Sequence, residues 1–186
     1  MVKAPKPGLG EFPTEDLESI LRELIDSPPR SSVLTAASLI DYALERLIGS
    51  HLRTPSKKND WELFTDNGLF GTFSRKIMGA YYMKLIGPNT RRELDIIRAI
   101  RNDCAHDLKP VTFATLGIAS RCRELRAFLG RSFSDEPLAM KLLLSATAVQ
   151  FFAQVELLLA PEEVRKKWAA TLEKAAESFV LPAITE

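Results

Sequence analysis

The chain has 186 residues, 46% of them hydrophobic, which is enough for one well-filled core and barely enough for two. Its 25 basic and 24 acidic residues nearly cancel, so the average charge favours neither a strong nucleic-acid binder nor a membrane-surface protein. The two cysteines lack the spacing of a disulfide framework or a metal site. We therefore expect one domain over residues 14–180, with a flexible arm at 1–13 and a tail at 181–186, and no metal or cofactor.

The balanced average hides a basic segment. Residues 75–131 hold 12 Lys and Arg against 5 Asp and Glu, whereas the segments on either side are each more acidic than basic. The segment includes Arg91, Arg92, Arg98 and Arg101, which together predict a positive surface patch. The first three are candidates for contacts with the phosphates of a nucleic acid, and the alternative is an ordinary solvated helix face.

Apolar residues recur at helical spacing along the whole chain, and no segment shows the alternation of a strand bounded by hairpin turns. We expect helices over residues 14–25, 31–51, 70–86, 115–129 and 138–159, one that begins at 90 and ends within 101–106, and one from 161 onward, with a short apolar turn at 61–64. Thr90 and Glu93 predict a capping box at the start of the helix that begins at 90. The predicted fold is an all-α, single-domain bundle of about seven helices, at least about 60% helical.

Two further features bear on location. The long apolar run from Leu138 to Ala160 contains charged and amide side chains, which favours a buried helix of a bundle over a membrane span. The first eight residues lack the apolar centre of a signal peptide. We therefore expect a cytoplasmic protein that does not associate with a membrane.

The stretch Arg101-Asn102-Asp103-Cys104-Ala105-His106 carries most of the chemical information. Arg presents a rigid fork of donors that matches a phosphate, and His changes its charge near neutral pH. Two side chains five positions apart on a helix point about 140° away from each other around its axis. Arg101 and His106 therefore converge on one ligand only if the helix ends between them. Asp107 and Pro110 soon after the motif predict such an end.

The same residues also have structural explanations. Arg101 can pair with Asp41 or Glu45, which lie four positions apart on one helix face. His106 can interact with the terminal carbonyl groups of its own helix. Cys104 falls on the apolar stripe of that helix, which favours a core thiol over a nucleophile. The spacing alone favours these structural roles, whereas the basic surroundings and the amide next to Arg101 favour a phosphate site.

The order and spacing of several motifs resemble the mannitol operon repressor (MltR-like) family, over roughly residues 30–160. The motifs are Gly68-Leu69-Phe70-Gly71-Thr72-Phe73-Ser74-Arg75-Lys76, Glu93-Leu94 and Ile100-Arg101-Asn102-Asp103-Cys104-Ala105-His106-Asp107. The Arg-x4-His spacing is also similar to the signature of the wider HEPN superfamily of helical proteins, many of whose active members are metal-independent RNases. The resemblance implies a helical regulator, and we expect it to act as a homodimer with a protein or nucleic-acid partner.

If the HEPN resemblance extends to activity, it implies that Arg101 holds the scissile phosphate and Asn102 orients it. His106 would move the proton of the ribose 2′-hydroxyl or of the leaving oxygen. The chain departs from the toxin-type HEPN proteins, which often have an aromatic residue two places after the His, because it has Asp107-Leu108 here; Asp107 can instead hold the His106 imidazole. Three functions therefore remain open. They are a repressor-type regulator of transcription, a metal-independent RNase, and an interaction module in which the motif only stabilises a dimer. The family label favours the regulator over the enzyme.

Overall fold

The computed structural model describes residues 14–52, 61–125 and 137–166, and all regular secondary structure in these ranges is helical. The helices are α1 (Thr14–Asp26), α2 (Pro29–His51), α3 (Trp61–Phe64), α4 (Phe73–Tyr82), α5 (Pro88–His106), α6 (Leu116–Glu124) and α7 (Pro137–Leu159). Residues 162–166 are helical as well. The all-α prediction is confirmed, and the helical share of the described residues exceeds the expected 60%. The expected arm, the expected tail and most of the helix from 161 onward lie outside these ranges.

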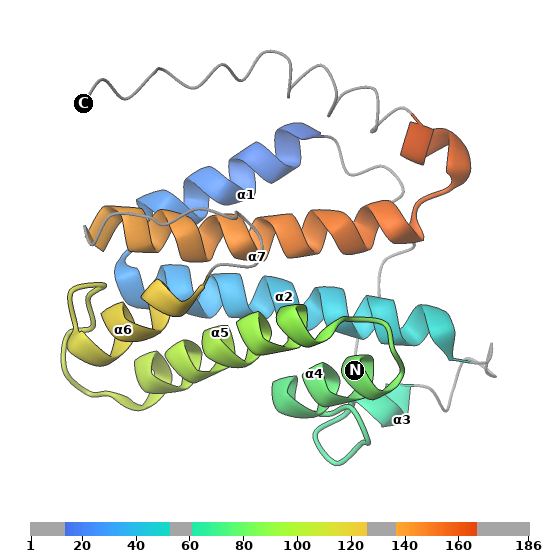
Figure 1. Ribbon diagram of the computed structural model, residues 1–186, viewed down its shortest axis with the longest axis horizontal. Coiled ribbons are helices and arrows are strands. Elements are labelled where there is room, and N and C mark those ends of the chain that lie inside the picture. The colour runs from blue at the N-terminus through green and yellow to red at the C-terminus, as the bar shows by residue number, and fades with distance from the viewer. Residues whose placement is uncertain (1–13, 53–60, 126–136, 167–186) are drawn as a thin grey trace.

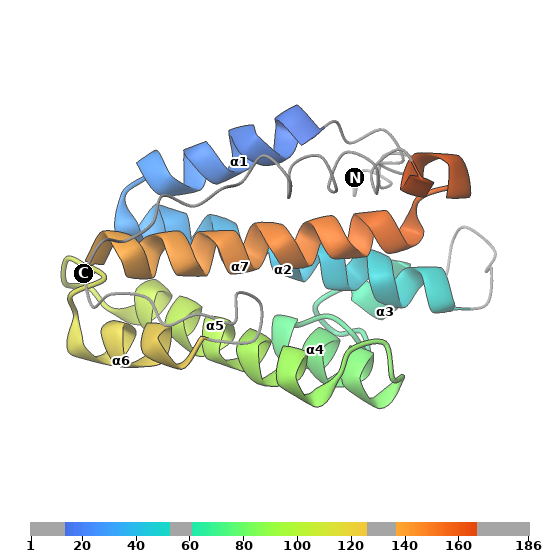
Figure 2. The same ribbon diagram turned by 45° about the horizontal axis from the view of Figure 1, so that its top comes forward.

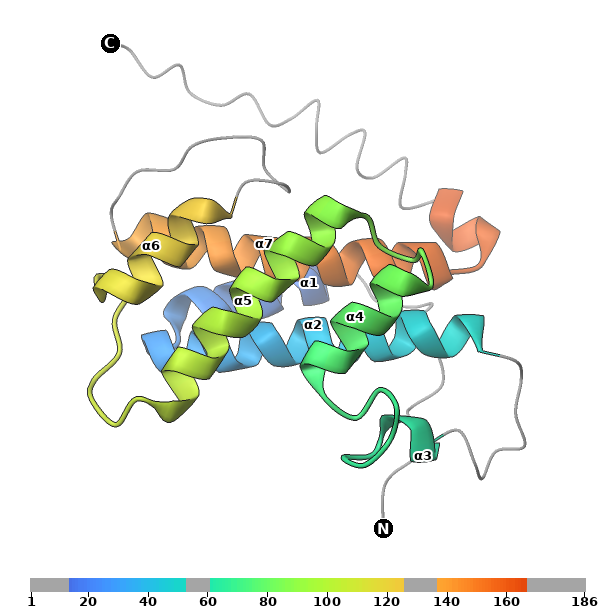
Figure 3. The same cartoon turned by 60° about the horizontal axis from the view of Figure 1, so that its bottom comes forward.

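Helix α2 is the centre of the bundle and packs against α1, α4, α5 and α7. Helices α2 and α7 run alongside each other, with α1 on one side of the pair (Figure 1). Helices α4, α5 and α6 lie on the other side, as the turned view shows (Figure 2). Helix α5 crosses over α2 and α7 with α4 beside it (Figure 3). The motif helix α5 therefore packs against the central helix α2 where the two cross.

The predicted apolar stripes form the core. Leu94, Ile97, Ile100 and Cys104 of α5 are all fully buried. The apolar positions expected on α2 are also buried; they are Val33, Ala36, Ala37, Ile40, Leu44, Leu47 and Ile48. Each stripe faces another helix rather than solvent, which supplies most of the stability of such a bundle.

Helix α7 is the one helix of the described residues that is long and apolar enough to cross a membrane by length and composition. More than half of its apolar stretch is buried inside the bundle, where it contacts α1, α2 and α6. It buries Phe151 and Phe152 almost completely. Its apolar character is accounted for by its place in the core.

Several helix boundaries differ from the prediction, and the largest difference is at α4, which is shorter than the expected 70–86. The hydroxyl of Thr72 accepts the N–H of Arg75 at 3.3 Å, which caps the helix three residues later than expected. At the other end Lys84 has a φ of 60°. The N–H groups of Lys84 and Leu85 each return 2.9 Å to carbonyl groups of the last turn, those of Tyr81 and Ala80. This is the helix-ending hydrogen-bond pattern that glycine usually provides.

Further differences are at α5 and α6. Helix α5 begins at Pro88 after Gly87, so Thr90 lies inside the first turn and the expected capping box is wrong. Proline at the first position has no N–H to leave unpaired, which explains the earlier start. Helix α6 ends at Glu124, because Leu125 is extended, rather than at the expected residue 129.

Candidate functional site

A polar pocket of about 540 Å³ lies between α2, the start of α4 and α5. Asp41 and Glu45 of α2 line one side, and Arg101 and Asn102 of α5 line another, together with Arg98. The structure therefore brings both predicted acids and the first two motif residues to one pocket. The prediction of which groups pair within it needs correction.

Lys76, and not Arg101, is the close partner of the two acids. Its Nζ lies 2.8 Å from Asp41 Oδ2 and 2.8 Å from Glu45 Oε2, and its side chain is only 5% exposed. Burial lowers the pKa of Lys76, but hydrogen bonds to the two carboxylates and their negative charges outweigh this effect, so its pKa is raised. Lys76 is thus a fixed cation that neutralises part of the acidic wall.

Lys76 was not among the residues expected at the site, although the sequence contains a signal for it. Phe73, Ile77 and Ala80 form the inward face of α4, and Lys76 lies on that same face. A lysine on an apolar stripe needs a buried acid. The acid pair four residues apart on α2 is the natural complement.

Arg101 is exposed at the rim of this pocket. Its Nη1 donates to Asn102 Oδ1 at 3.1 Å, so the neighbouring amide orients the guanidinium itself. Asn102 is half-buried. Arg101 therefore presents its remaining donors to the pocket opening, where they can bind a carboxylate or a phosphate.

His106 lies elsewhere, and the predicted convergence with Arg101 is wrong. Helix α5 continues without interruption through His106, so the helix does not end between the two residues. His106 lines a separate pocket of about 360 Å³ with Asp103, Asp107 and Thr115. Pro110 and the extended backbone of Asp107 end the helix only after the motif. One chain therefore does not direct both motif side chains into the same pocket.

Asp107, which we expected to hold the imidazole of His106, bonds to the backbone after α5. Its Oδ1 accepts the N–H of Lys109 at 2.9 Å, which shapes the turn after α5. Arg30 at the start of α2 donates to the carbonyl groups of Asp107 and Lys109 at 2.7 and 2.8 Å. These contacts attach the end of the motif helix to α2, and they do not involve the imidazole of His106.

The expected positive patch is largely neutralised by ion pairs. Arg91 Nε lies 3.7 Å from Asp95, and Arg98 Nε lies 3.3 Å from the same carboxylate. Arg92 lies 3.7 Å from Glu124. The three arginines proposed for phosphate contacts thus each have an acid beside them, which counts against a nucleic-acid surface that depends on charge alone.

The buried cysteines give a direct test of the core assignment. Burial raises the pKa of Cys104 to about 11 and that of Cys122 to about 12, and both side chains are 0% exposed. At pH 8 only about a thousandth of the Cys104 thiol would be thiolate, the form that reacts. We expect both thiols to resist a disulfide reagent such as dithionitrobenzoate in native protein and to react at once in denaturant. Rapid native labelling of Cys104 would contradict the core role.

The fold and site define a helical bundle with a charge-compensated polar pocket, in which Arg101 and His106 of one chain lie in separate pockets. The bundle is similar to a chain of the X-ray structure of the MtlR–HPr complex from Escherichia coli, with a TM-score of 0.59 and 16% sequence identity. The match covers 75% of this chain and 98% of the other. No family model and no curated protein matches the sequence. The fold is therefore MtlR-like.

Proposed function

We propose that this protein is a non-catalytic regulator that acts by binding a protein partner. The observation that carries the proposal is the fold, which is similar over 98% of the other chain to a protein solved in complex with HPr. The separate pockets of Arg101 and His106 support a binding role over hydrolysis, because general acid–base catalysis needs both groups within reach of one substrate.

The proposal has three finer parts. The partner is a protein of the HPr type, the regulator acts on transcription as a repressor would, and it works as a cytoplasmic homodimer. Within this scheme Arg101 and Asn102 serve binding or the dimer contact rather than chemistry. The exposed fork of Arg101 at the pocket rim is suited to a partner carboxylate.

A calorimetric titration of the full chain with purified HPr from its own host tests the proposal. We expect saturable binding, with Arg101→Ala weakening it or lowering dimer content in sedimentation. Lys166→Ala, an exposed cation outside the pockets, is the matched control and should bind as wild type does. If a high concentration of HPr gives neither heat of binding nor a mobility shift, HPr is ruled out as the partner.

Incubation with single-stranded RNA in EDTA tests the enzymatic alternative on the same preparation. We expect no cleavage by wild-type protein. Metal-independent cleavage that is lost in His106→Ala and reduced in Arg101→Lys, with the fold intact by circular dichroism, would replace the regulator with an RNase. In that case proton transfer by His106 would contribute about 10²–10⁴-fold to the rate.

A further inference from the structure

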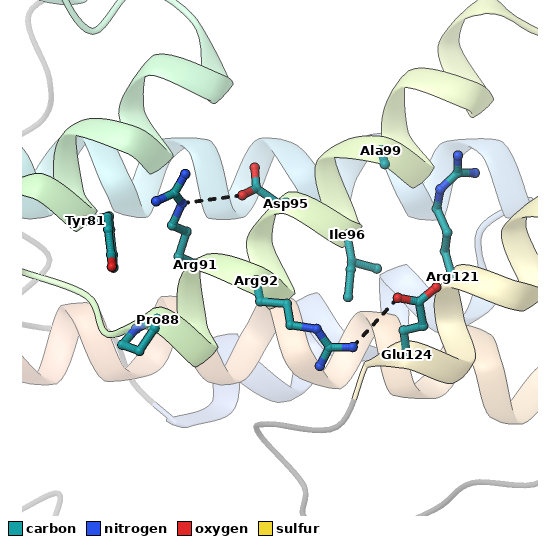
Figure 4. Close-up of a pocket in the computed structure, with 9 residues that line it drawn as sticks. All are labelled: Tyr81, Pro88, Arg91, Arg92, Asp95, Ile96, Ala99, Arg121 and Glu124. Carbon is teal, nitrogen blue, oxygen red and sulfur yellow. Dashed lines mark ion pairs between the residues drawn. The ribbon is translucent and has the colours of Figure 1, made fainter.

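A groove of about 510 Å³, separate from the two pockets described above, lies where the end of α4, helix α5 and helix α6 meet. Its floor is apolar and includes Pro88, Ile96 and Ala99 (Figure 4). Charged groups surround this floor; they are the guanidinium groups of Arg91, Arg92 and Arg121 and the carboxylates of Asp95 and Glu124. The groove combines an apolar strip with three cations, and the proposed binding of HPr assigns no role to it.

The ion pairs of Arg91 and Arg92 in this groove are loose. Arg91 to Asp95 and Arg92 to Glu124 both measure 3.7 Å, which is beyond hydrogen-bond distance, and these side chains are 36–57% exposed. Exposed pairs of this kind contribute about 0–1 kcal/mol. Arg91 can therefore exchange Asp95, and Arg92 can exchange Glu124, for a carboxylate supplied by a partner at little cost. Arg92 also lies 3.9 Å from the buried Glu93 and keeps that contact.

An exposed apolar patch adjoins the groove. Leu69, Met78 and Tyr82 are 65%, 46% and 70% exposed and line a hollow of about 530 Å³. Arg91 joins the two surfaces, since its Cζ lies 4.5 Å from the ring centroid of Tyr81 and 5.9 Å from that of Tyr82. Tyr, Met and Arg are the residue types that interfaces favour.

We propose that the groove and the patch form one docking surface for an acidic, amphipathic segment of a partner protein. Apolar side chains of the segment would cover Leu69, Met78 and Tyr82, and its carboxylates would pair with Arg91 and Arg92. The assignment rests on the proposed function in one respect, that the partner is a protein. Beyond the proposed function, it states which surface binds the partner and that the bound segment is acidic.

The charges of the groove favour a peptide over a nucleic acid. Asp95 and Glu124 lie in the groove and would repel a phosphate backbone, whereas individual carboxylates can be placed beside single arginines. The ring of Tyr81 already has Arg91 over it and is not open for stacking by a base. Arg121 is itself paired with Asp103, and Arg91 and Arg92 each have an acid beside them, so the groove has little net charge. It therefore offers little of the counterion release that drives binding to a polyanion.

Selection from a random peptide library on the immobilised full chain tests the proposal whatever the identity of the partner. We expect enriched peptides to combine Asp or Glu with apolar residues. In fluorescence anisotropy, Arg92→Glu and Tyr82→Ser should each weaken the best peptide by at least about tenfold. Lys166→Glu and Leu158→Ser, an exposed cation and an exposed apolar residue outside the surface, should change its affinity by less than about twofold. A peptide with its acids replaced by the corresponding amides should bind weakly.

Three outcomes would overturn the proposal. The first is enrichment of peptides without acids, or peptide binding that Arg92→Glu and Tyr82→Ser leave unchanged. The second is tighter binding of oligouridine through these residues, which would assign the surface to nucleic acid. The third is self-association that the same two variants abolish, which would assign it to a second copy. If HPr binds but no acidic peptide is selected, only the docking surface is ruled out. If acidic peptides are selected but HPr does not bind, only HPr is ruled out as the partner.

Discussion

Replacing Lys76 with methionine is expected to lower the free energy of unfolding by about 3 kcal/mol, because it removes one partner of a buried ion cluster. Methionine keeps most of the volume of the lysine stem, so the loss measures the charge rather than a cavity. Asp41 and Glu45, which are neighbours on one face of α2, then lose the cation that lies 2.8 Å from each of them. Their side chains are 33% and 29% exposed and can rehydrate in part, which keeps the loss at the lower end for a broken buried pair.

Urea denaturation followed by circular dichroism measures this loss. Lys166→Met, which removes only the exposed pair with Glu162, is the matched control and should cost less than about 0.5 kcal/mol. Adding Asp41→Asn and Glu45→Gln to Lys76→Met should recover part of the stability by removing the unpaired charges. Because the pKa of Lys76 is raised, its contribution is fully present below pH 10.5 and is lost only as the pH rises through the higher folded value. A loss below about 1 kcal/mol at neutral pH would show that the cluster is solvated.

The helices were predictable because the apolar residues of each one recur at helical spacing in the local sequence. The fully buried stripe of α5, from Leu94 to Cys104, repeats every three or four residues whatever helices pack against it. The end of α4 was not predictable in the same way. Lys84 adopts a left-handed conformation that sequence statistics assign mainly to glycine and asparagine, so the pattern alone extended the helix to residue 86.

The sequence predicted most residues of the candidate site but not how they are arranged. Asp41, Glu45, Arg101 and Asn102 do share a pocket, because residues on facing stripes of packed helices come together. The separation of Arg101 from His106 depended on where α5 ends, and helix ends are the least certain part of a pattern. Which cation pairs with Asp41 and Glu45 depended on the packing of α4 against α2, and this tertiary contact cannot be read from local sequence. Pairing could therefore be proposed from the sequence only as a set of alternatives.

Replacing Arg46 with methionine is the second change with a large expected effect, and this effect should depend on pH. Arg46 Nε lies 2.6 Å from Glu156 Oε1 and joins α2 to α7, with the two side chains 17% and 3% exposed. Burial raises the pKa of Glu156, while the charge of Arg46 lowers it. Without Arg46 only the raising effect remains, so the carboxyl group must either carry an unpaired buried charge or take up a proton.

The sign of the pH dependence follows from this shift. When the folded pKa of a carboxyl group is higher than the unfolded one, the folded state holds more protons, and stability falls as the pH rises from the ordinary value of 4.5 through the folded value. We expect Arg46→Met to cost about 3–5 kcal/mol at neutral pH and clearly less near pH 5. Arg46→Lys, which keeps the charge, should lose less at neutral pH, and Glu156→Gln combined with Arg46→Met should remove the pH dependence. Denaturant midpoints measured across this range decide the matter, since an equal loss at every pH would show that Arg46 acts through packing and not through the charge of Glu156.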